Sequence, residues 1–537
     1  MARELKEIER KYDGITLPAA GLEGLPGVAA TRGAEPQDLD AVYYDTPDLR
    51  LLRRRITVRR RSGGSDAGWH VKLPLDVDSR QEVRLPLDAG GPHQVPEQFA
   101  NRLAAFTRGA ALLPVAQLRT HRSRRQLLDD KGRILAEVTE DRVAAQTFDA
   151  TPAPNAPGRR GKSVLPTAVD SAGGTAARAS GWTEFEVELE HGTRSLLDDI
   201  DDRVAAAGLT RSAWPSKLAH ALGSTGTAQA GPATPGDTDG TRSAGELVTH
   251  GIRTHCDRLL ELDGAVRSGE EDSVHQMRIT ARRLRSLLKA HRRLFDTNQS
   301  TPLADQLRWL ARLLGEARDQ EVLADQLVDA SSAVPAAVRE GALRDRITER
   351  YARGYQAAWQ RAVAELDGAR YFTLLDDLED FAAHPPLRRR ARRDVGDYLA
   401  GALRREQRRT LHRLDRALDA ETGAAQDEAL HRARKAAKRA RYTAECARPA
   451  TGRTTAKRLA KYAVRMKKLH KVLGNQHDSV VVRRALVDLG TQADTDRRHV
   501  FAYGVLHEVQ RRAGDDALAR LPRLRRRAAR RKLTRMP

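Results

Sequence analysis

Cysteine, aromatic residues and long apolar runs are all scarce in this chain. Its 537 residues include only two cysteines, Cys256 and Cys446, which cannot build a disulfide framework and suit a reducing compartment. No apolar run approaches the roughly 20 residues that a membrane-spanning helix needs. The N-terminus starts with charged residues instead of a signal peptide. These absences predict a cytoplasmic protein without a membrane partner.

Charge is abundant and is divided unevenly along the chain. The formal net charge is +22, made of −1 for residues 1–241 and +23 for residues 242–537. A concentrated positive field attracts polyanions, here nucleic acid, an anionic membrane or polyphosphate. Aromatic residues make up only 4% of the chain, which argues against single-stranded nucleic acid read by base stacking. The C-terminal half is therefore expected to face a polyanion.

Composition predicts an α+β chain of two domains. Residues 1–221 contain segments of period two and are predicted to form strands. Residues 148–181, rich in Ala, Pro, Gly, Ser and Thr, are predicted to be a flexible insertion between strands, and residues 222–242 an interdomain linker. Residues 243–533 are rich in Ala, Leu and Arg and are predicted to be helical.

The predicted strands carry charge on a single face. In Thr183–Glu190 every even position is acidic, and Glu7, Glu9 and Lys11 also stand at alternate positions. Alternate residues of a strand share a face, so these side chains point the same way. Four further segments repeat the pattern and contain Arg59 and Arg61, Lys72, Glu82 and Arg84, and Glu137 and Asp141. Two structures fit this pattern: a solvated sheet with cross-strand ion pairs, or a closed barrel with a polar interior.

The residue types in this domain suit chemistry on a phosphoanhydride. Such hydrolysis needs a divalent cation on oxygen ligands, together with Arg and Lys that neutralise the phosphates. The metal ligands are predicted to be Glu7, Glu9, Glu186 and Glu188. The predicted phosphate ligands are Arg59, Arg61, Lys72, Arg84, Arg122 and Lys217. Lys11 is predicted to bind a terminal phosphate or to orient water, and Glu82, Glu137 and Asp141 to hold basic side chains or join the metal shell.

These residues, in this order, resemble the CYTH domain of the triphosphate tunnel metalloenzymes. The resemblance rests on a set of short motifs: Glu7-x-Glu9-x-Lys11, Tyr43–Pro47, the strand with Arg59 and Arg61, Trp69–Leu73, Glu82-x-Arg84, Glu137 with Asp141, Glu186-x-Glu188, and Lys217. It implies an antiparallel eight-stranded tunnel that binds triphosphates with Mg²⁺ or Mn²⁺. Family members hydrolyse inorganic triphosphate or thiamine triphosphate, or cyclise ATP.

An internal repeat marks the helical half. His275 is followed by basic residues at offsets +3, +7, +8 and +10, and His431 has the same offsets. Downstream, Leu314–Asp319 echoes Leu473–Asp478. Steps of three and four place the cations along one helix stripe, where like charges repel. This stripe is either a solvated basic face or an anion site. Its residues are His275, Arg278, Arg282, Arg283, Arg285, Lys289, His431, Arg434, Lys435, Lys438, Arg439 and Arg441.

This half resembles the CHAD domain, the conserved-histidine α-helical domain. The resemblance implies a pair of helical bundles with pseudo-twofold symmetry that enclose a basic channel for inorganic polyphosphate. Family members occur fused to CYTH domains and are associated with polyphosphate granules. The leading hypothesis is thus a cytoplasmic, metal-dependent triphosphatase that binds polyphosphate and no specific nucleic acid. The alternatives are a non-catalytic polyphosphate scaffold, a thiamine triphosphatase and an adenylate cyclase.

Overall fold

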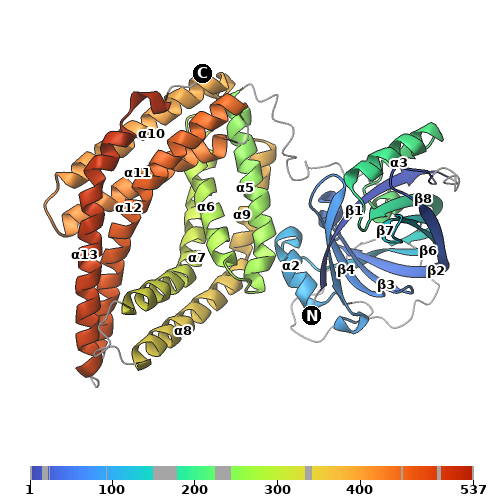
Figure 1. The fold of residues 1–537 in the computed structure, drawn as a ribbon, viewed down its shortest axis with the longest axis horizontal. Coiled ribbons are helices and arrows are strands. Elements are labelled where there is room, and N and C mark those ends of the chain that lie inside the picture. The colour runs from blue at the N-terminus through green and yellow to red at the C-terminus, as the bar shows by residue number, and fades with distance from the viewer. Residues whose placement is uncertain are drawn as a thin grey trace. The chain divides into compact units, whose positions relative to one another are not determined.

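The computed structural model describes residues 3–14, 22, 24–91, 94–148, 178–223, 243–332, 341–448, 451–492 and 497–534. The chain forms two compact units, Met1–Pro232 and Ala233–Pro537. Figure 1 shows strands in the first and helices in the second. Most of the predicted insertion (148–181) and of the predicted linker (222–242) lies outside the described residues, so both remain predictions.

The strands of the first unit close into an antiparallel barrel. They are β1 (Arg3–Asp13), β2 (Ala30–Asp45), β3 (Thr57–Ser62), β4 (Gly68–Pro74), β5 (Ser79–Leu85), β6 (Leu113–Leu128), β7 (Ile134–Thr147) and β8 (Ala179–Leu189). Their order is β5-β4-β3-β2-β6-β7-β8-β1, and β1 pairs again with β5. The short β9 (Thr210–Arg211) adds to β1. The predicted eight-stranded barrel is confirmed.

The barrel turns its apolar faces outward, where helices cover them. Val58 and Trp69 form a buried cluster with Phe99 of α2 (Glu97–Thr107). On another part of the wall, Val187 clusters with Ile200 of α3 (Arg194–Ala206). Because side chains alternate along a strand, covering the apolar faces outside directs the charged faces into the barrel. This resolves the choice left open by the strand pattern in favour of a polar interior.

One part of the interior is apolar and is filled by the short helix α4 (Lys217–Ala221). Leu218 of this helix is fully buried with Leu118 and Val143 of the barrel wall. The Ser216 side chain accepts a hydrogen bond from the Ala219 backbone N–H and so caps the helix. The cap and the apolar contacts fix the first residue of the helix, Lys217, at the edge of the charged interior.

The second unit consists of long helices. They are α5 (Ala244–Arg267), α6 (Ser273–Ala290), α7 (Thr297–Ser331), α8 (Gly341–Leu366), α9 (Ala369–Ala383), α10 (Val395–Leu418), α11 (Ala424–Ala447), α12 (Arg453–Gln492) and α13 (Arg497–Ala528). The runs α5–α8 and α10–α13 each pack in sequence order, and α6 of the first run contacts α11 of the second. The predicted pair of helical bundles is therefore present, and α6 and α11 carry the two histidine-led repeats.

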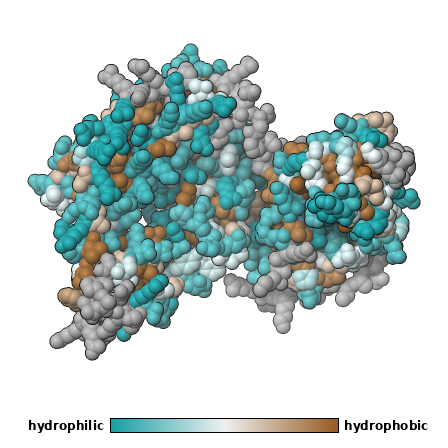
Figure 2. Space-filling model, viewed as in Figure 1, coloured by the Kyte–Doolittle hydropathy of each residue, from teal (hydrophilic) through white to brown (hydrophobic). Residues whose placement is uncertain are grey.

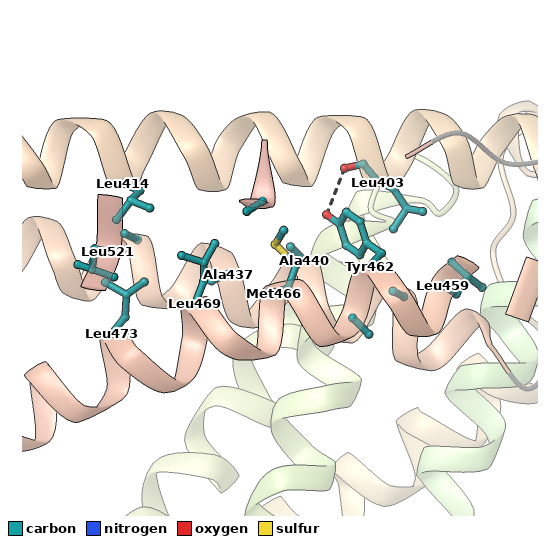
Figure 3. Close-up of a cluster of buried hydrophobic side chains, with 14 of the residues drawn as sticks. Leu403, Leu414, Ala437, Ala440, Leu459, Tyr462, Met466, Leu469, Leu473 and Leu521 are labelled. Carbon is teal, nitrogen blue, oxygen red and sulfur yellow. Dashed lines mark hydrogen bonds between the residues drawn. The ribbon is translucent and has the colours of Figure 1, made fainter. Parts of the chain in front are cut away.

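Burial of apolar stripes holds these helices together. In the second bundle, Leu414, Met466 and Leu521 belong to one buried cluster, drawn in Figure 3. The Tyr462 hydroxyl lies in this cluster and donates a hydrogen bond of 3.3 Å to the Leu403 carbonyl, so its polar end is satisfied. The face shown in Figure 2 is largely hydrophilic over these helices. No helix among the described residues is long and apolar enough to cross a membrane.

Candidate triphosphate tunnel and polyphosphate surface

Charged side chains from the strands converge on a cavity inside the barrel, called the tunnel below. Its lining combines carboxylates, ammonium groups and guanidinium groups. The lining residues are Glu7, Glu9, Lys11, Tyr43, Thr57, Arg59, Arg61, Asp66, Lys72, Arg80, Arg84, Arg122, Glu186, Glu188, Ser216 and Lys217. All the predicted metal and phosphate ligands of this domain are among them. Glu82 and Asp141 are fully buried just behind this lining.

Strand register explains why many tunnel charges are paired. Lys11 stands directly opposite Glu186, and the two form an ion pair. Lys72 stands opposite Glu82 and also lies 2.6 Å from a carboxylate oxygen of Glu7. Directly opposed side chains on antiparallel strands lie about 5 Å apart, so opposite charges in register neutralise one another. These pairs stabilise the charged lining of the tunnel.

Asp141 is the anchor of a second group of cations. Arg122 donates two hydrogen bonds to its carboxylate, of 2.7 and 2.6 Å. The Lys217 ammonium lies 2.9 Å from Asp141, 2.8 Å from Glu184 and 2.6 Å from Glu186. Burial alone would raise the pKa of Asp141, but Lys217 and Arg122 outweigh it and hold that pKa well below its usual value. Asp141 therefore stays ionised and fixes both cations in the tunnel wall.

Glu82 fixes the other side of the tunnel in the same manner. It pairs with Arg84, and one of its carboxylate oxygens lies 2.9 Å from His70 Nδ1 and 3.7 Å from Arg59 Nη2. Burial opposes ionisation of Glu82, yet His70, Lys72 and Arg59 together hold its pKa well below the usual range. Glu137, the third predicted supporting acid, is half-buried and lies 3.8 Å from Arg124. It is not among the residues that line the cavity.

Carboxylates face one another across three neighbouring strands. Glu9 of β1 is opposite Glu188 of β8, which is opposite Glu137 of β7. Burial first, and then repulsion from Glu7 and Glu9, raises the pKa of Glu188 to about 7. Burial also raises the pKa of Glu7. Like charges held in register favour a bound cation, and these acids offer the oxygen donors that Mg²⁺ and Mn²⁺ take.

The oxygen donors of this acidic row suit a divalent cation, but the side chains are not grouped around a single point. Among the described residues, no three Asp, Glu, His or Cys side chains are grouped closely enough to hold a metal ion. Instead, Glu7 contacts Lys72, and Glu186 contacts Lys11 and Lys217. Binding of a cation would require Glu7 and Glu9 to turn from the basic groups toward Glu188.

Lys11 combines burial with a near-neutral pKa. Its ammonium pairs with Glu186 and lies 3.7 Å from Glu9. Burial, and then repulsion from Lys217 and Arg80, lowers the pKa of Lys11 to about 7, although Glu9 opposes the shift. An amine with this pKa is present in both protonation states near pH 7. It can hold a phosphate when charged and accept a proton when neutral.

The histidine-led helices of the second unit bring their cations together. Arg278 and Arg282 of α6 meet Arg434 and Lys438 of α11, so that each guanidinium or ammonium repels its neighbours. Burial, and then Arg282, Arg434 and Arg278, lowers the pKa of Lys438 to about 5. Burial and the same crowding lower the pKa of Arg282 to about 10. A concentration of positive charge that nearby acids compensate only in part would be stabilised by an anion.

Each half contributes an arginine that lies over a helix glycine. An added Cβ at Gly315 of α7 would stand 3.2 Å from the Arg278 guanidinium, which donates a hydrogen bond of 2.9 Å to Asp319. In the second half, a Cβ at Gly474 of α12 would stand 3.6 Å from Arg434 and 4.0 Å from Asp478. In each half, the Leu-Gly-x-x-x-Asp motif thus provides a glycine against which an arginine packs and a carboxylate close to that arginine.

Histidines border this basic surface. The rings of His431 and His477 have centroids 4.5 Å apart. Burial, and then Arg434 and its neighbours, lowers the pKa of His477 to about 4 and that of His470 to about 3. Burial, and then Arg318, also lowers the pKa of His275. With these pKa values the rings are neutral near pH 7, so they can act as hydrogen-bond partners and gain charge when an anion binds.

Comparison with known proteins identifies both units. A model of the CYTH domain matches residues 5–220, and a model of the CHAD domain matches residues 250–487. This chain belongs to the CYTH and CHAD families. The CYTH unit is the barrel with the tunnel, and the CHAD unit is the helical pair with the basic surface.

Relatives match either nearly the whole chain or one part of it. An uncharacterised protein of Mycobacterium tuberculosis (strain ATCC 25618 / H37Rv) is 36% identical over 519 residues, 95% of this chain and 93% of that protein. The solved CHAD domain of the plant Ricinus communis is 24% identical with a TM-score of 0.42, covering 53% of this chain and 92% of that chain. A Hippeastrum protein, described as an adenylyl cyclase candidate with a dominant triphosphatase activity, is 13% identical with a TM-score of 0.22, covering 40% of this chain and 95% of that chain.

Sequence reasoning missed several residues of the CYTH tunnel. Arg80 stands opposite Glu7 and lies 3.2 Å from Glu9, and Glu184 contacts Lys217. Glu184 occupies the charged face of a predicted strand, and Arg80 has the same parity as Glu82 and Arg84 but precedes the predicted segment by one residue, so strand parity was a usable signal for both. Asp66 lies on the loop between β3 and β4, and Ser216 precedes α4. No periodic pattern places a loop residue in a tunnel.

The other predicted residues of the CHAD surface make contacts of several kinds. Arg439 donates a hydrogen bond of 2.7 Å to Glu406 of α10. Arg283 lies over the Tyr442 ring, 5.6 Å from its centroid. Arg285 repels Lys435, and it also repels Lys289 at the exposed end of the stripe. Arg441 pairs with Glu445 and also lies over Tyr442. The surface is therefore centred on Arg278, Arg282, Arg434 and Lys438.

Proposed function

We propose that the CYTH unit hydrolyses inorganic triphosphate or short polyphosphate with a divalent cation, and that the CHAD unit binds inorganic polyphosphate. The observation that carries the proposal is the closed tunnel, in which a row of carboxylates faces cations suited to phosphate oxygens. Members of the CYTH family are triphosphatases or cyclases and generally depend on a metal. Polyphosphate held by the CHAD unit would localise the enzyme to polyphosphate granules in the cytoplasm.

The tunnel residues divide the chemical work. Glu7, Glu9 and Glu188 would hold Mg²⁺ or Mn²⁺, which would supply Lewis-acid stabilisation of the phosphate charge when bound. Arg59, Arg61 and Arg122 would bind and orient the phosphate oxygens, and catalysis of this reaction is mainly orientation plus charge stabilisation. Lys11, with its near-neutral pKa, would hold the terminal phosphate or take a proton from the attacking water.

The test is phosphate release from inorganic tripolyphosphate by the full-length protein with Mg²⁺ or Mn²⁺. Because metal ligands supply several kcal/mol of transition-state stabilisation, Glu7→Gln and Glu9→Gln should each lower the rate by on the order of 100-fold. Glu140→Gln is a matched control. Glu140 stands on β7 opposite the outward-facing Phe185 and lies 3.2 Å from Arg142. Activity that survives both tunnel substitutions would reject the assignment.

The lining favours a fully ionic substrate over the alternatives. Among the described residues that line the cavity, Tyr43 is the one aromatic side chain, and its hydroxyl accepts a 3.5 Å hydrogen bond from Arg59. Adenine or the rings of thiamine would need a stacking surface. A panel of tripolyphosphate, long-chain polyphosphate, ATP and thiamine triphosphate ranks the activities. Polyphosphate binding without release from any substrate would instead favour the non-catalytic scaffold.

The proposed partner of the CHAD unit can be tested by competition. Polyphosphate and nucleic acid both bind basic surfaces with steep salt dependence, so salt alone does not separate them. Labelled long-chain polyphosphate bound to the full-length protein is challenged with duplex DNA at equal phosphate concentration. We expect polyphosphate to stay bound, and displacement by DNA would reverse this preference.

A further inference from the structure

The hairpin between β3 and β4 returns a carboxylate to the tunnel. Gly63 and Gly64 follow β3 with φ of +79° and +72°, a region that favours glycine. A Cβ at Gly63 would also stand 2.2 Å from the Asp38 backbone oxygen. This turn is therefore fixed by glycine, and it brings Asp66 back beside Arg61, one of the predicted phosphate ligands.

Asp66 makes contacts that resemble those expected of a phosphate. Its carboxylate pairs with Arg61 and lies 3.8 Å from Arg84 Nη1. Its backbone carbonyl accepts a 3.5 Å hydrogen bond from Arg61 Nη2 and lies 2.9 Å from His70 Nε2. An oxyanion shared between guanidinium groups is the arrangement by which arginine binds phosphate. Asp66 thus occupies an anion position within the tunnel lining.

Arg61 depends on Asp66 for the compensation of its charge. Among the described residues, the ion pair with Asp66 is the one that Arg61 makes. Burial, and then repulsion from Arg59, lowers the pKa of Arg61 to about 10, with Arg122 adding to the repulsion and Asp66 opposing it. Arg59 and Arg122 have acids of their own, Glu82 and Asp141.

The counterions differ in how easily they can leave. The side chains of Glu82 and Asp141 are 0% exposed, whereas that of Asp66 is 32% exposed on its hairpin. Turning Asp66 toward solvent costs little burial, while Arg61 remains inside at 4% exposure. A buried charge left without a partner is strongly unfavourable, so Arg61 requires either Asp66 or another anion.

We propose that Asp66 holds the place of a substrate phosphate on Arg61 and Arg84, and that a phosphate group displaces it on binding. This rests on the proposed function, because it takes the tunnel to be a site for phosphate chains. Displacing Asp66 costs free energy, so a ligand must gain enough contacts in the tunnel to offset that cost. A single orthophosphate exchanges one anion for another with few added contacts, whereas triphosphate gains further contacts with Arg59, Arg122 and Lys217. Asp66 thereby acts as an internal competitor that lowers the affinity of both ligands, and triphosphate, which gains the further contacts, still binds at concentrations where orthophosphate does not.

The experiment compares Asp66→Asn with the wild type in the full-length protein. Asp76→Asn is the matched control, because Asp76 lies on the next hairpin and is 3.5 Å from Arg194 at the surface. Binding of inorganic tripolyphosphate and of orthophosphate is measured by calorimetry in EDTA. The CHAD unit is unchanged in all three proteins, so differences between them belong to the tunnel. Removing the internal competitor should tighten tripolyphosphate binding about fivefold in Asp66→Asn and leave Asp76→Asn unchanged.

Thermal unfolding supplies a second readout that a merely structural role would not produce. Free Asp66→Asn should unfold at a lower temperature than the wild type, because Arg61 loses its partner. Saturating tripolyphosphate should remove that difference, since a phosphate then pairs with Arg61. Equal or weaker binding by Asp66→Asn, or a stability deficit that persists at saturation, overturns the proposal. Tighter binding without phosphate release by any variant in Mg²⁺ would reject the hydrolase function and retain the role of Asp66.

Discussion

At the scale of the residue, ionisable groups at both sites are held away from their usual pKa values by burial and by neighbours of like charge. Lys11 and Glu188 both have a pKa of about 7, although their usual values lie on opposite sides of neutrality. Lys438 has a pKa of about 5. Perturbed groups of this kind collect at functional sites.

The pKa of Lys438 predicts that polyphosphate binding takes up protons. Its pKa of about 5 leaves the amine neutral at pH 7, whereas a bound polyanion favours the charged form and raises that pKa. Binding should therefore consume up to about one proton at this residue, and affinity should rise as the pH falls from 7 toward 5. His470 and His477 add to the uptake in the same direction.

Calorimetry in buffers of different ionisation enthalpy measures this uptake directly. Lys438→Met keeps the length of the side chain and removes its proton, so the uptake should fall by about one proton relative to wild type. Arg432→Met is a control on the same helix, because Arg432 is exposed and lies 3.2 Å from Glu428. Proton release on binding, or uptake that is equal in wild type and Lys438→Met, would contradict the prediction.

Residue types on strand faces could be predicted from the sequence, because alternation fixes which side chains share a face. Glu7, Lys72 and Arg122 line the tunnel for that reason. Asp66 was not predictable, since its place depends on a glycine turn and on the pairing of β3 with β4. Nor did sequence reveal that Arg439 turns to Glu406, because both directions lie within reach of one helix stripe.

At the scale of the element, each bundle contains a helix glycine that packs against the neighbouring histidine-led helix. Gly315 of α7 and Gly474 of α12 both sit beneath an arginine of the neighbouring histidine-led helix, but the fit differs. A Cβ would stand 3.2 Å from Arg278 at the first position and 3.6 Å from Arg434 at the second. The first distance requires the arginine to move, and the second is ordinary contact.

This difference predicts unequal effects of alanine. Replacing a glycine inside a helix by alanine ordinarily stabilises by about 0.5–1 kcal/mol, which is expected for Gly474→Ala. Gly504→Ala in α13 is the control, because no atom lies within 4 Å of its added Cβ. Gly315→Ala should gain less stability and should weaken polyphosphate binding, because Arg278 is displaced. Urea unfolding and polyphosphate titration check this, and identical behaviour of Gly315→Ala and Gly474→Ala would contradict it.

The classes of element were predictable because their periods differ. Alternation indicated strands before residue 221, and the histidine-led repeat indicated paired helices after residue 243. Closure of the barrel depends on β1 pairing with both β5 and β8, a long-range contact that no local pattern contains. The helix α9 stands outside the order shared by α5–α8 and α10–α13 and had no counterpart in the sequence repeat.

At the scale of the whole molecule, the two candidate sites belong to separate compact units. In the part of the chain that the structure describes, the eight cations of the tunnel lining face five acids there, and the buried Glu82, Asp141 and Glu184 supply three more, whereas the CHAD surface gathers arginines from two helices beside fewer acids. Each site has its own charged residues, and the described contacts of each remain within one unit.

Because the two sites are separate, we expect a substitution in one site to leave the property of the other site nearly unchanged. Glu7→Gln should lower the rate of phosphate release from tripolyphosphate by on the order of 100-fold and leave the affinity for long-chain polyphosphate within about twofold of wild type. Arg282→Ala with Arg434→Ala should do the reverse, weakening long-chain binding by about tenfold or more while tripolyphosphate turnover stays near wild type. Kinetics and equilibrium binding on the same preparations measure both. A variant that loses both properties while remaining folded would show that the sites are coupled.

The pairing of like helices in the CHAD unit also bears on the kind of polymer it suits. Arg278 over Gly315 and Arg434 over Gly474 present nearly the same groups from opposite halves. A strand laid along such a surface would meet an equivalent sequence of contacts when reversed end for end. Inorganic polyphosphate reads the same in either direction, whereas a nucleic acid strand has distinct 5′ and 3′ ends, so a surface repeated in this way matches a polymer without polarity.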